Sequence, residues 1–236
     1  MTSPGGEETP AGAYPAGDGL RLSRVEFLPE LRLYLFDASV GLFDPAGGEY
    51  RSDRPPPFWG FAWAGGQAVA RYVLDHPETV RGRRVLDLAC GSGLVAVAAA
   101  KAGAAHVVAV DVDPGALAAV KANARANGVR IDCVERDILP GPPVDVDLVL
   151  AGDVFYSKAM ADRVDGFLRR AARAGVAVLV GDPDRGYLKS SLFRPVVTYD
   201  IPVSTAVEGV SSQRTTVFEL RGVTAPDERV QRPLRT

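Results

Sequence analysis

The chain alternates short apolar runs with amphipathic stretches from about residue 84 onward. The apolar runs predict strands at 84–88, 106–111, 130–134, 146–151 and 175–181. The stretches between them predict helices at 93–102, 114–127 and 158–173. Runs such as residues 107–110 are almost continuously apolar, which is typical of strands covered on both faces. This alternation predicts a parallel sheet with helices on both faces.

The pattern changes after Asp182. Residues 195–203 and 215–220 indicate two strands without space for a full helix between them, so we expect an antiparallel hairpin at the sheet edge. The predicted fold is therefore α/β: a Rossmann-like, seven-stranded, mostly parallel sheet that ends in an antiparallel hairpin. This arrangement is the usual form of methyltransferases that use S-adenosylmethionine (SAM).

The remaining segments suggest a simple domain organisation. Residues 1–19 are rich in Gly, Pro, Ala and Glu, so we expect a disordered tail. Residues 20–57 form an N-terminal segment that we expect to cover the substrate side; residues 20–43 within it predict a strand or short helix. Residues 58–222, with a further helix expected at 67–74, form the SAM-binding domain, and residues 223–236 a C-terminal tail.

Composition narrows the possible functions. The 236-residue chain has a net charge of −2 and no run of Lys or Arg, so nucleic-acid binding is not expected. No apolar run approaches the ~18 residues of a membrane span, and no signal segment opens the chain, so we expect a cytoplasmic protein. Two cysteines, Cys90 and Cys133, and two histidines, His76 and His106, are too scattered to predict a metal site.

The strongest local signal is the stretch from residue 85 to 93, in which an apolar strand runs into a Gly-x-Gly loop and a helix. Gly91 and Gly93 allow the backbone to approach a ligand closely, and the helix N-terminus behind them offers free N–H groups. Asp87 lies four residues before Gly91. A carboxylate aimed into the loop suits the cationic amino acid part of SAM better than a pyrophosphate.

Other candidate residues follow the next strands, and the carboxyl ends of parallel strands meet at one ligand-binding edge. Asp111 can accept both ribose hydroxyl groups, and Val112 can pack on adenine; Asp113 before Pro114 is the better helix N-cap. Asp137 and Ile138 can read the adenine edge.

A second group of candidates lies where the cofactor's methyl group would be. Gly152, Asp153, Phe155 and Tyr156 follow the fourth strand. Upstream, Trp59 and Trp63 can attract sulfonium or ammonium groups through cation–π contacts and can equally well be packed as core.

These residues resemble a known family. The stretch 55–77, beginning Pro-Pro-Pro-Phe-Trp-Gly-Phe-Ala-Trp, is similar to the entry segment of seven-strand methyltransferases that modify lysines of the electron transfer flavoprotein β subunit. Gly152-Asp-Val-Phe-Tyr156 matches the D/E-x-x-Y/F motif of the wider lysine methyltransferase group. Residues 181–188, 198–203 and 215–218 resemble the family's C-terminal part, so the similarity covers roughly residues 24–221.

The resemblance implies roles for individual residues. Asp153 and Tyr156 would face the target amine, with Phe155 shaping the channel. The cofactor-binding candidates are Trp59, Trp63, Asp87, Ala89, Gly91, Gly93, Asp111, Val112, Asp137, Ile138 and Gly152. Two features depart from the family pattern: Ala89-Cys90 in the nucleotide loop, and the insert at 44–54 with the Gly/Pro-rich N-terminus.

The preferred prediction is SAM-dependent methylation of an amine, most simply an exposed lysine of a protein. The altered N-terminal segment keeps a small-molecule N- or O-methyltransferase open as an alternative. An NAD-dependent oxidoreductase would not explain Asp87 and lacks an obvious catalytic Tyr-x-x-x-Lys set. A non-catalytic SAM-binding module would have little use for Asp153 and Tyr156.

Overall fold

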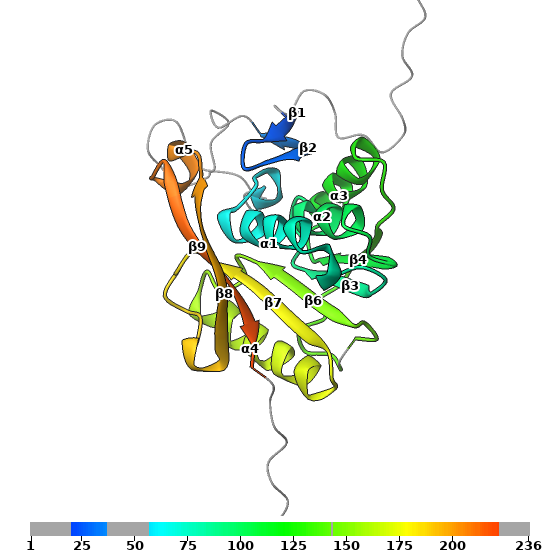
Figure 1. Ribbon diagram of the computed structural model, residues 1–236, viewed down its shortest axis with the longest axis vertical. Helices are drawn as coiled ribbons and strands as arrows, with labels where there is room; N and C mark the ends of the chain where they lie inside the picture. The colour runs from blue at the N-terminus through cyan, green and yellow to red at the C-terminus, as the bar shows by residue number, and fades with distance from the viewer. Residues whose placement is uncertain (1–19, 37–56, 143, 222–236) are drawn as a thin grey trace, which may run out of the picture.

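The chain is built around a seven-stranded sheet with the order β5-β4-β3-β6-β7-β9-β8 (Figure 1). The computed structural model describes residues 20–36, 57–142 and 144–221. The strands are β3 Arg84–Leu88, β4 His106–Asp111, β5 Asp132–Glu135, β6 Leu148–Gly152, β7 Ala177–Asp182, β8 Phe193–Pro202 and β9 Ser212–Leu220. β3 to β7 run parallel to one another, and β9 runs antiparallel to both β7 and β8. The predicted fold, including the edge hairpin, is confirmed.

Three predicted strands begin later than the apolar pattern indicated. β5 begins at Asp132 rather than at residue 130, β6 at Leu148 rather than at 146, and β7 at Ala177 rather than at 175. The amide of Val146 donates to the carbonyl of Val144, and that of Asp147 donates to the carbonyl of Arg84, so the chain before Leu148 is still turning into the sheet. Apolar residues at a strand entrance therefore extended the prediction by two positions.

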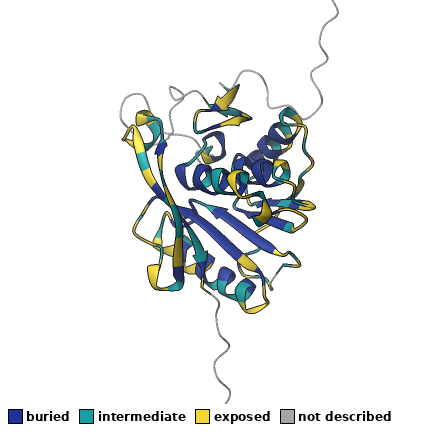
Figure 2. Cartoon of the chain, viewed as in Figure 1, coloured by how far each residue is buried: buried dark blue, intermediate teal, exposed yellow. Residues whose placement is uncertain are grey.

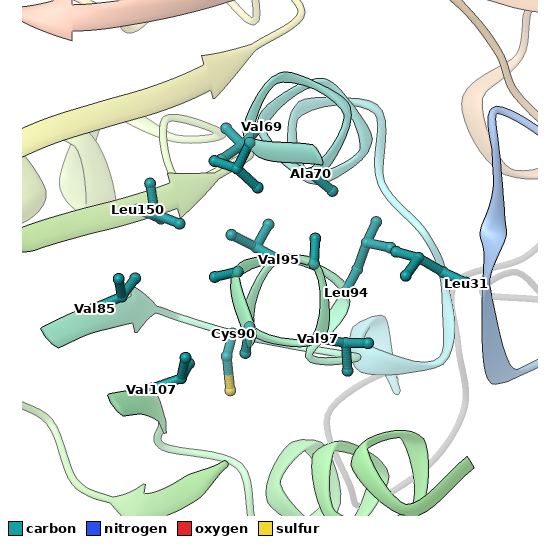
Figure 3. Packing of buried hydrophobic residues seen from close by; sticks show 14 of the residues in the cluster. Leu31, Val69, Ala70, Val85, Cys90, Leu94, Val95, Val97, Val107 and Leu150 are labelled. Carbon is teal, nitrogen blue, oxygen red and sulfur yellow. The ribbon is translucent and has the colours of Figure 1, made fainter. Parts of the chain in front are cut away.

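Four helices cover the sheet: α1 Ala64–Asp75, α2 Leu94–Lys101, α3 Pro114–Ala126 and α4 Lys158–Arg173. α1, α2 and α3 lie on one side and α4 on the other (Figure 1). Successive strand residues alternate between two cores: Val85, Val107 and Leu150 pack with α1 and α2, whereas Leu86 and Val149 pack with α4. Both faces of the central strands are therefore buried. Figure 2 shows these strands as buried, and Figure 3 shows the packing on the side of α1 and α2.

The first described segment forms a separate antiparallel hairpin of β1 Leu20–Val25 and β2 Leu28–Phe36. A single strand or short helix was expected over 20–43, and that expectation is wrong for residues 20–36: the chain turns at Glu26-Phe27 and pairs with itself. Side chains of α3 hold the edge of β2. Asn123 accepts from the amide of Tyr34, and Asn127 both accepts from and donates to the backbone of Arg32.

The N-terminus of α1 lies directly against the carboxyl ends of β6 and β7. A Cβ at Gly152 would come within 2.5 Å of the Cα of Gly66, and a Cβ at Gly181 within 2.0 Å of the carbonyl oxygen of Gly65. A Cβ at Gly65 would likewise come within 2.3 Å of the carbonyl oxygen of Gly181, so the absence of side chains at Gly65, Gly152 and Gly181 permits this crossing. The crossing brings the segment before α1 to the edge of the sheet where the candidate residues lie.

The structure does not describe the predicted terminal tails or the predicted insert. The predicted tails, 1–19 and 223–236, and the insert at 44–54 lie outside the described residues. Across the described ranges, no helix combines the length and the apolar character needed to cross a membrane.

Candidate cofactor and acceptor site

The loop after β3 contains residues in the left-handed backbone conformation that favours glycine. Gly91 has a φ of 50°, and Gly93, the residue before α2, has a φ of 76°. Ala89 also has a positive φ, of 53°, although it carries a side chain. A Cβ at Gly91 would meet the Cα of Trp59 at 3.8 Å, an ordinary contact, whereas a Cβ at Gly93 would come within 2.8 Å of Val120. Gly93 is thus needed for packing, and Gly91 leaves open space beside the loop.

Asp87 lies beneath this loop and is almost completely buried. Its carboxylate accepts a hydrogen bond of 2.9 Å from the amide of Ala96 in the first turns of α2. Burial, and to a lesser extent the nearby charge of Asp111, raises the pKa of Asp87 well above its usual range. A cation placed beside this carboxylate would favour its ionised form. Asp87 is therefore suited to the cationic ligand group that the sequence predicts for it.

Asp111, at the end of β4, forms hydrogen bonds with the loop after β3 and with the backbone that follows β4. It accepts from the amide of Gly91 at 3.0 Å and from the amides of Val112 and Asp113 at 2.8 and 3.0 Å. Val112 beside it is 65% exposed, an unusual position for an apolar side chain. Asp113 accepts from the amide of Gly115 at the start of α3, as an N-cap should. This leaves Asp111 and Val112 at the open edge of the sheet.

A small cavity of about 50 Å³ lies between the loop after β3 and the end of β6. Asp87, Gly91 and Ser92 line one side, and Trp63, Gly66 and Gly152 line another. A larger hollow of about 470 Å³ lies at the opposite edge of the sheet, between Arg84, Asp147 and Gly175. We assign the site to the smaller cavity, because ligands of open α/β sheets bind at the carboxyl ends of the strands near the reversal of strand order, here between β3 and β6.

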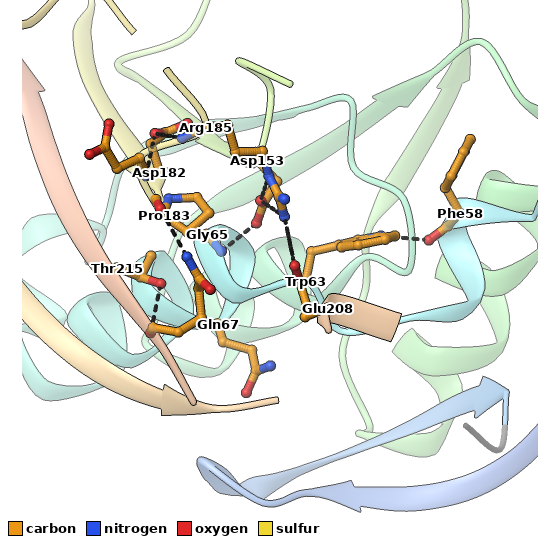
Figure 4. A network of polar contacts seen from close by, with 12 residues as sticks. Phe58, Trp63, Gly65, Gln67, Asp153, Asp182, Pro183, Arg185, Glu208 and Thr215 are labelled. Carbon is orange, nitrogen blue, oxygen red and sulfur yellow. Dashed lines mark hydrogen bonds and ion pairs between the residues drawn. The ribbon is translucent and has the colours of Figure 1, made fainter. Parts of the chain in front are cut away.

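Asp153 follows β6 in a left-handed conformation with a φ of 56° and is 9% exposed. One carboxylate oxygen accepts from the amide of Gly65 at the N-terminus of α1. The other accepts from Nε of Arg185 at 2.8 Å and lies 2.6 Å from its Nη2. Figure 4 shows these contacts. Burial raises the pKa of Asp153 to about 6, against the opposing effects of Arg185 and of the hydrogen bonds.

The two tryptophans have different surroundings. Trp59 is buried against Ala116 and Ala119 of α3, and its ring lies 5.5 Å from that of Phe36. Trp63 lines the cavity, donates a 2.8 Å hydrogen bond to the carbonyl of Phe58, and stacks under Arg185. Trp59 therefore shapes the site through packing, while the ring of Trp63 reaches it.

Three further candidate positions differ in exposure. Tyr156 is 58% exposed beyond β6, where a substrate could reach it. Phe155 is almost fully buried and packs edge-on against Phe193, so it belongs to the core and not to the expected substrate channel. Asp137, next to the half-buried Ile138, accepts from the amide of Leu139 and is paired with Arg163, so part of its hydrogen-bonding capacity is already used.

Sequence reasoning missed two charged residues of the site. Arg185 follows β7, and Glu208 lies in the short helix α5, Thr205–Glu208, between β8 and β9. Arg185 bridges Glu208 and Asp153. The position of Arg185 after a buried parallel strand could have indicated a role, because that strand end lies at the same edge as Gly152. Nothing local marks Glu208.

The donor set fits SAM. A buried carboxylate, Asp87, suits an ammonium group; a carboxylate at the end of β4, Asp111, suits ribose hydroxyls; and the exposed Val112 offers an apolar face for adenine. The open space beside Gly91 allows close approach of a ligand to the backbone.

Comparison with known proteins finds similarity to methyltransferases. A model of the ribosomal protein L11 methyltransferase (PrmA) family matches residues 71–168. The electron transfer flavoprotein β subunit lysine methyltransferase of Danio rerio is 42% identical over 142 residues, which cover 59% of this chain and 55% of that protein. The protein of the same name from Xenopus laevis is 38% identical over 168 residues, 69% of this chain and 68% of that protein. The matched region thus spans 55% of the length of the first relative and 68% of the length of the second.

A solved structure supports the fold. The 16S rRNA N2 G1207 methyltransferase of T. thermophilus, in complex with AdoMet and guanosine, aligns with a TM-score of 0.50 at 20% identity. The alignment covers 68% of this chain and 43% of that one. At this identity the likeness concerns the arrangement of strands and helices alone.

Proposed function

The chain belongs to the electron transfer flavoprotein β subunit lysine methyltransferase family, and from this premise we propose that it methylates lysine side chains of a protein, using SAM as methyl donor. The proposed target is a protein that resembles the electron transfer flavoprotein β subunit. One observation carries the proposal: Asp87, Asp111 and Asp153 lie at the carboxyl ends of three parallel strands, β3, β4 and β6, and Asp87 lines the cavity beside Gly91.

In this proposal the residues divide into a cofactor side and an acceptor side. Asp87 binds the ammonium group of SAM, Asp111 its ribose hydroxyls, and Val112 its adenine, with Gly91 and Gly93 permitting close approach. Gly152 and Trp63 line the cavity between the two sides. Ala89, Asp137, Ile138 and Trp59 complete the cofactor side.

Bound SAM would supply a methyl group on a positively charged sulfur, which a neutral amine can take up while the electron pair of the broken C–S bond stays on sulfur. A lysine amine, with a reference pKa of ~10.4, must lose a proton before it can attack. The aromatic surfaces of Trp63, Phe58 and Tyr156 remove water from the amine, and desolvation lowers its pKa. Positioning then supplies most of the catalysis.

Asp153 orients the amine by accepting a hydrogen bond from it. Only the ionised carboxylate is suited to this role, because a protonated carboxyl group would donate to the amine lone pair that must attack carbon. Asp153 is therefore proposed as an orienting group rather than as an obligatory base.

The exposure of the acceptor side favours a protein substrate over a small molecule. Among the described residues, Phe58, Tyr156 and Tyr187 are 53%, 58% and 42% exposed. A small-molecule enzyme more commonly encloses its substrate in a pocket, whereas an open aromatic rim can accept a lysine that projects from a protein surface.

The proposal is tested by incubating the protein with methyl-labelled SAM and a cell lysate. Label should enter a protein and be lost after Asp153→Asn substitution. Label confined to small molecules would favour the small-molecule alternative, and the absence of any transfer would contradict the proposed activity.

A further inference from the structure

Arg185 contacts two buried carboxylates on the acceptor side. Its guanidinium contacts Asp153 at 2.6 Å and Glu208 at 3.2 Å, and its central carbon lies 5.6 Å from the centre of the Trp63 ring. Asp153 and Glu208 are both more than nine-tenths buried as side chains, whereas Arg185 is 26% exposed. One cation thus serves two buried carboxylates, which leaves the group with a formal net charge of −1.

The loop that carries Arg185 is held in place. Asp182 accepts from the amides of Asp184 and Arg185 at 2.8 and 3.2 Å, and Asp184 has a φ of 64°. Gln213 of β9 donates to the carbonyl of Pro183 at 3.0 Å, as Figure 4 shows. These contacts bend the chain sharply after β7 and direct the Arg185 side chain toward the end of β6, so its position beside Asp153 follows from the backbone.

We propose that Arg185 is a positioning residue of the acceptor site, which holds the Asp153 carboxylate ionised and oriented so that it can accept a hydrogen bond from the incoming amine. Glu208 holds the same Nη2 nitrogen of the guanidinium that faces Asp153. The inference rests on the proposed function, in which Asp153 orients the acceptor amine.

The charges around Asp153 shift its pKa in opposite directions. From the loop after β7, Arg185 lowers the pKa of Asp153, and from α5, Glu208 raises it. From α1, the amide of Gly65 also lowers it. Removing Arg185 should therefore move the titration of Asp153 toward higher pH, by about one unit or more for a charge at this distance. Removing the charge of Glu208 should move it toward lower pH.

The experiment follows the titration directly. The full chain is labelled with ¹³C at Asp side-chain carboxyl carbons, the Asp153 signal is assigned by its loss in Asp153→Asn, and its midpoint is measured in wild type, Arg185→Gln and Glu208→Gln. The matched control is Arg194→Gln, which breaks an exposed pair with Glu219 between β8 and β9. We expect a higher midpoint in Arg185→Gln, a lower one in Glu208→Gln and no change in Arg194→Gln.

Methyl transfer then serves as a second readout. The acidic limb of kcat/KM should move with the Asp153 midpoint in each variant, and Arg185→Lys, which keeps the charge, should restore part of the shift. An unchanged or lower midpoint in Arg185→Gln would overturn the inference. If that variant does not fold, an unchanged midpoint in Glu208→Gln overturns it. Because the titration needs no substrate, a failure of the proposed activity would appear separately, as an inactive wild-type protein whose Asp153 still titrates as expected.

Discussion

The carboxylate of Asp87 accepts a hydrogen bond from the amide of Ala96, 2.9 Å away, and so joins the end of β3 to the first turns of α2. This contact places a buried acid under a glycine loop and beside a cavity. The acid is stabilised by one backbone donor but lacks a cation of its own among the hydrogen bonds and ion pairs of the described residues. It is therefore suited to a positively charged ligand group.

Asp87→Asn should weaken SAM binding by about tenfold or more while leaving the fold intact. The amide oxygen of Asn can still accept from Ala96, but the charge–charge interaction with the ligand ammonium is lost, and hydrogen bonds to charged groups contribute about 1.5–3 kcal/mol. Isothermal titration calorimetry measures this effect. Asp132→Asn, on the exposed end of β5, is the matched control and should bind normally. Unchanged affinity in Asp87→Asn would contradict the placement of the ammonium.

Gly91→Ala and Gly93→Ala should separate binding from folding. Both glycines have positive φ, which costs an L-residue roughly 1–2 kcal/mol. At Gly93 the new methyl group also meets Val120 at 2.8 Å, whereas at Gly91 it enters open space. Gly93→Ala should therefore lower the melting temperature more, and Gly91→Ala should reduce SAM affinity more. The reverse order in thermal unfolding would contradict the packing of the loop.

Asp153→Asn should lose most of the methyl transfer while SAM affinity changes by a few-fold at most. Asn tolerates the left-handed φ of this position better than Ala does, so the substitution removes the charge with little backbone strain. Parallel measurement of turnover and of SAM binding checks the prediction. Turnover at the wild-type rate would remove Asp153 from the mechanism.

The difference in the free energy of unfolding between Asp153→Asn and the wild-type protein should depend on pH. The pKa of Asp153 is raised to about 6 in the folded state, above its ordinary value of 3.8. The folded state thus binds this proton more tightly than the unfolded state, and the contribution of Asp153 to stability falls as pH rises from about 4 to about 6. Relative to wild type, Asp153→Asn should gain stability over this range, by at most about 3 kcal/mol. Urea unfolding at pH 4.5 and pH 7 tests the difference; the opposite trend would contradict it.

Asn123→Ala should destabilise the protein by about 2 kcal/mol or more. The side chain is fully buried, donates to the carbonyl of Ser92 at 2.8 Å and accepts from the amide of Tyr34. Truncation leaves the buried carbonyl of Ser92 and the part-buried amide of Tyr34 without these partners, and an unsatisfied buried group costs about 1–3 kcal/mol. Denaturant unfolding measures the loss, with Asn127→Ala, at the more exposed end of α3, as a milder comparison.

The central sheet could be predicted from the sequence because each of its strands is marked by its own run of apolar residues. The apolar runs that became β3 and β4 match the structure to the residue, since strands buried on both faces need continuous apolar side chains. The hairpin of β1 and β2 was not predicted, because its position depends on Asn123 and Asn127, about 90 residues away.

The candidate site was predicted in part for the same reason. Asp87, Asp111 and Asp153 could be found because they end or follow apolar strands, so their common edge follows from topology. The surroundings of Asp153 could not, because Arg185 and Glu208 reach it from 32 and 55 residues away in sequence, and only the pairing of β7 with β9 brings them near. Phe155 was placed in a channel because its motif neighbours are candidate site residues, whereas its packing against Phe193 puts it in the core.

Mass spectrometry of purified electron transfer flavoprotein β subunit, after incubation with this protein and SAM, tests the proposed lysine methylation most directly. We expect mass increments of whole methyl groups, mapped to lysine side chains and absent when Asp153→Asn replaces the wild-type protein. An unmodified β subunit, in the presence of a wild-type protein that binds SAM normally, would contradict it.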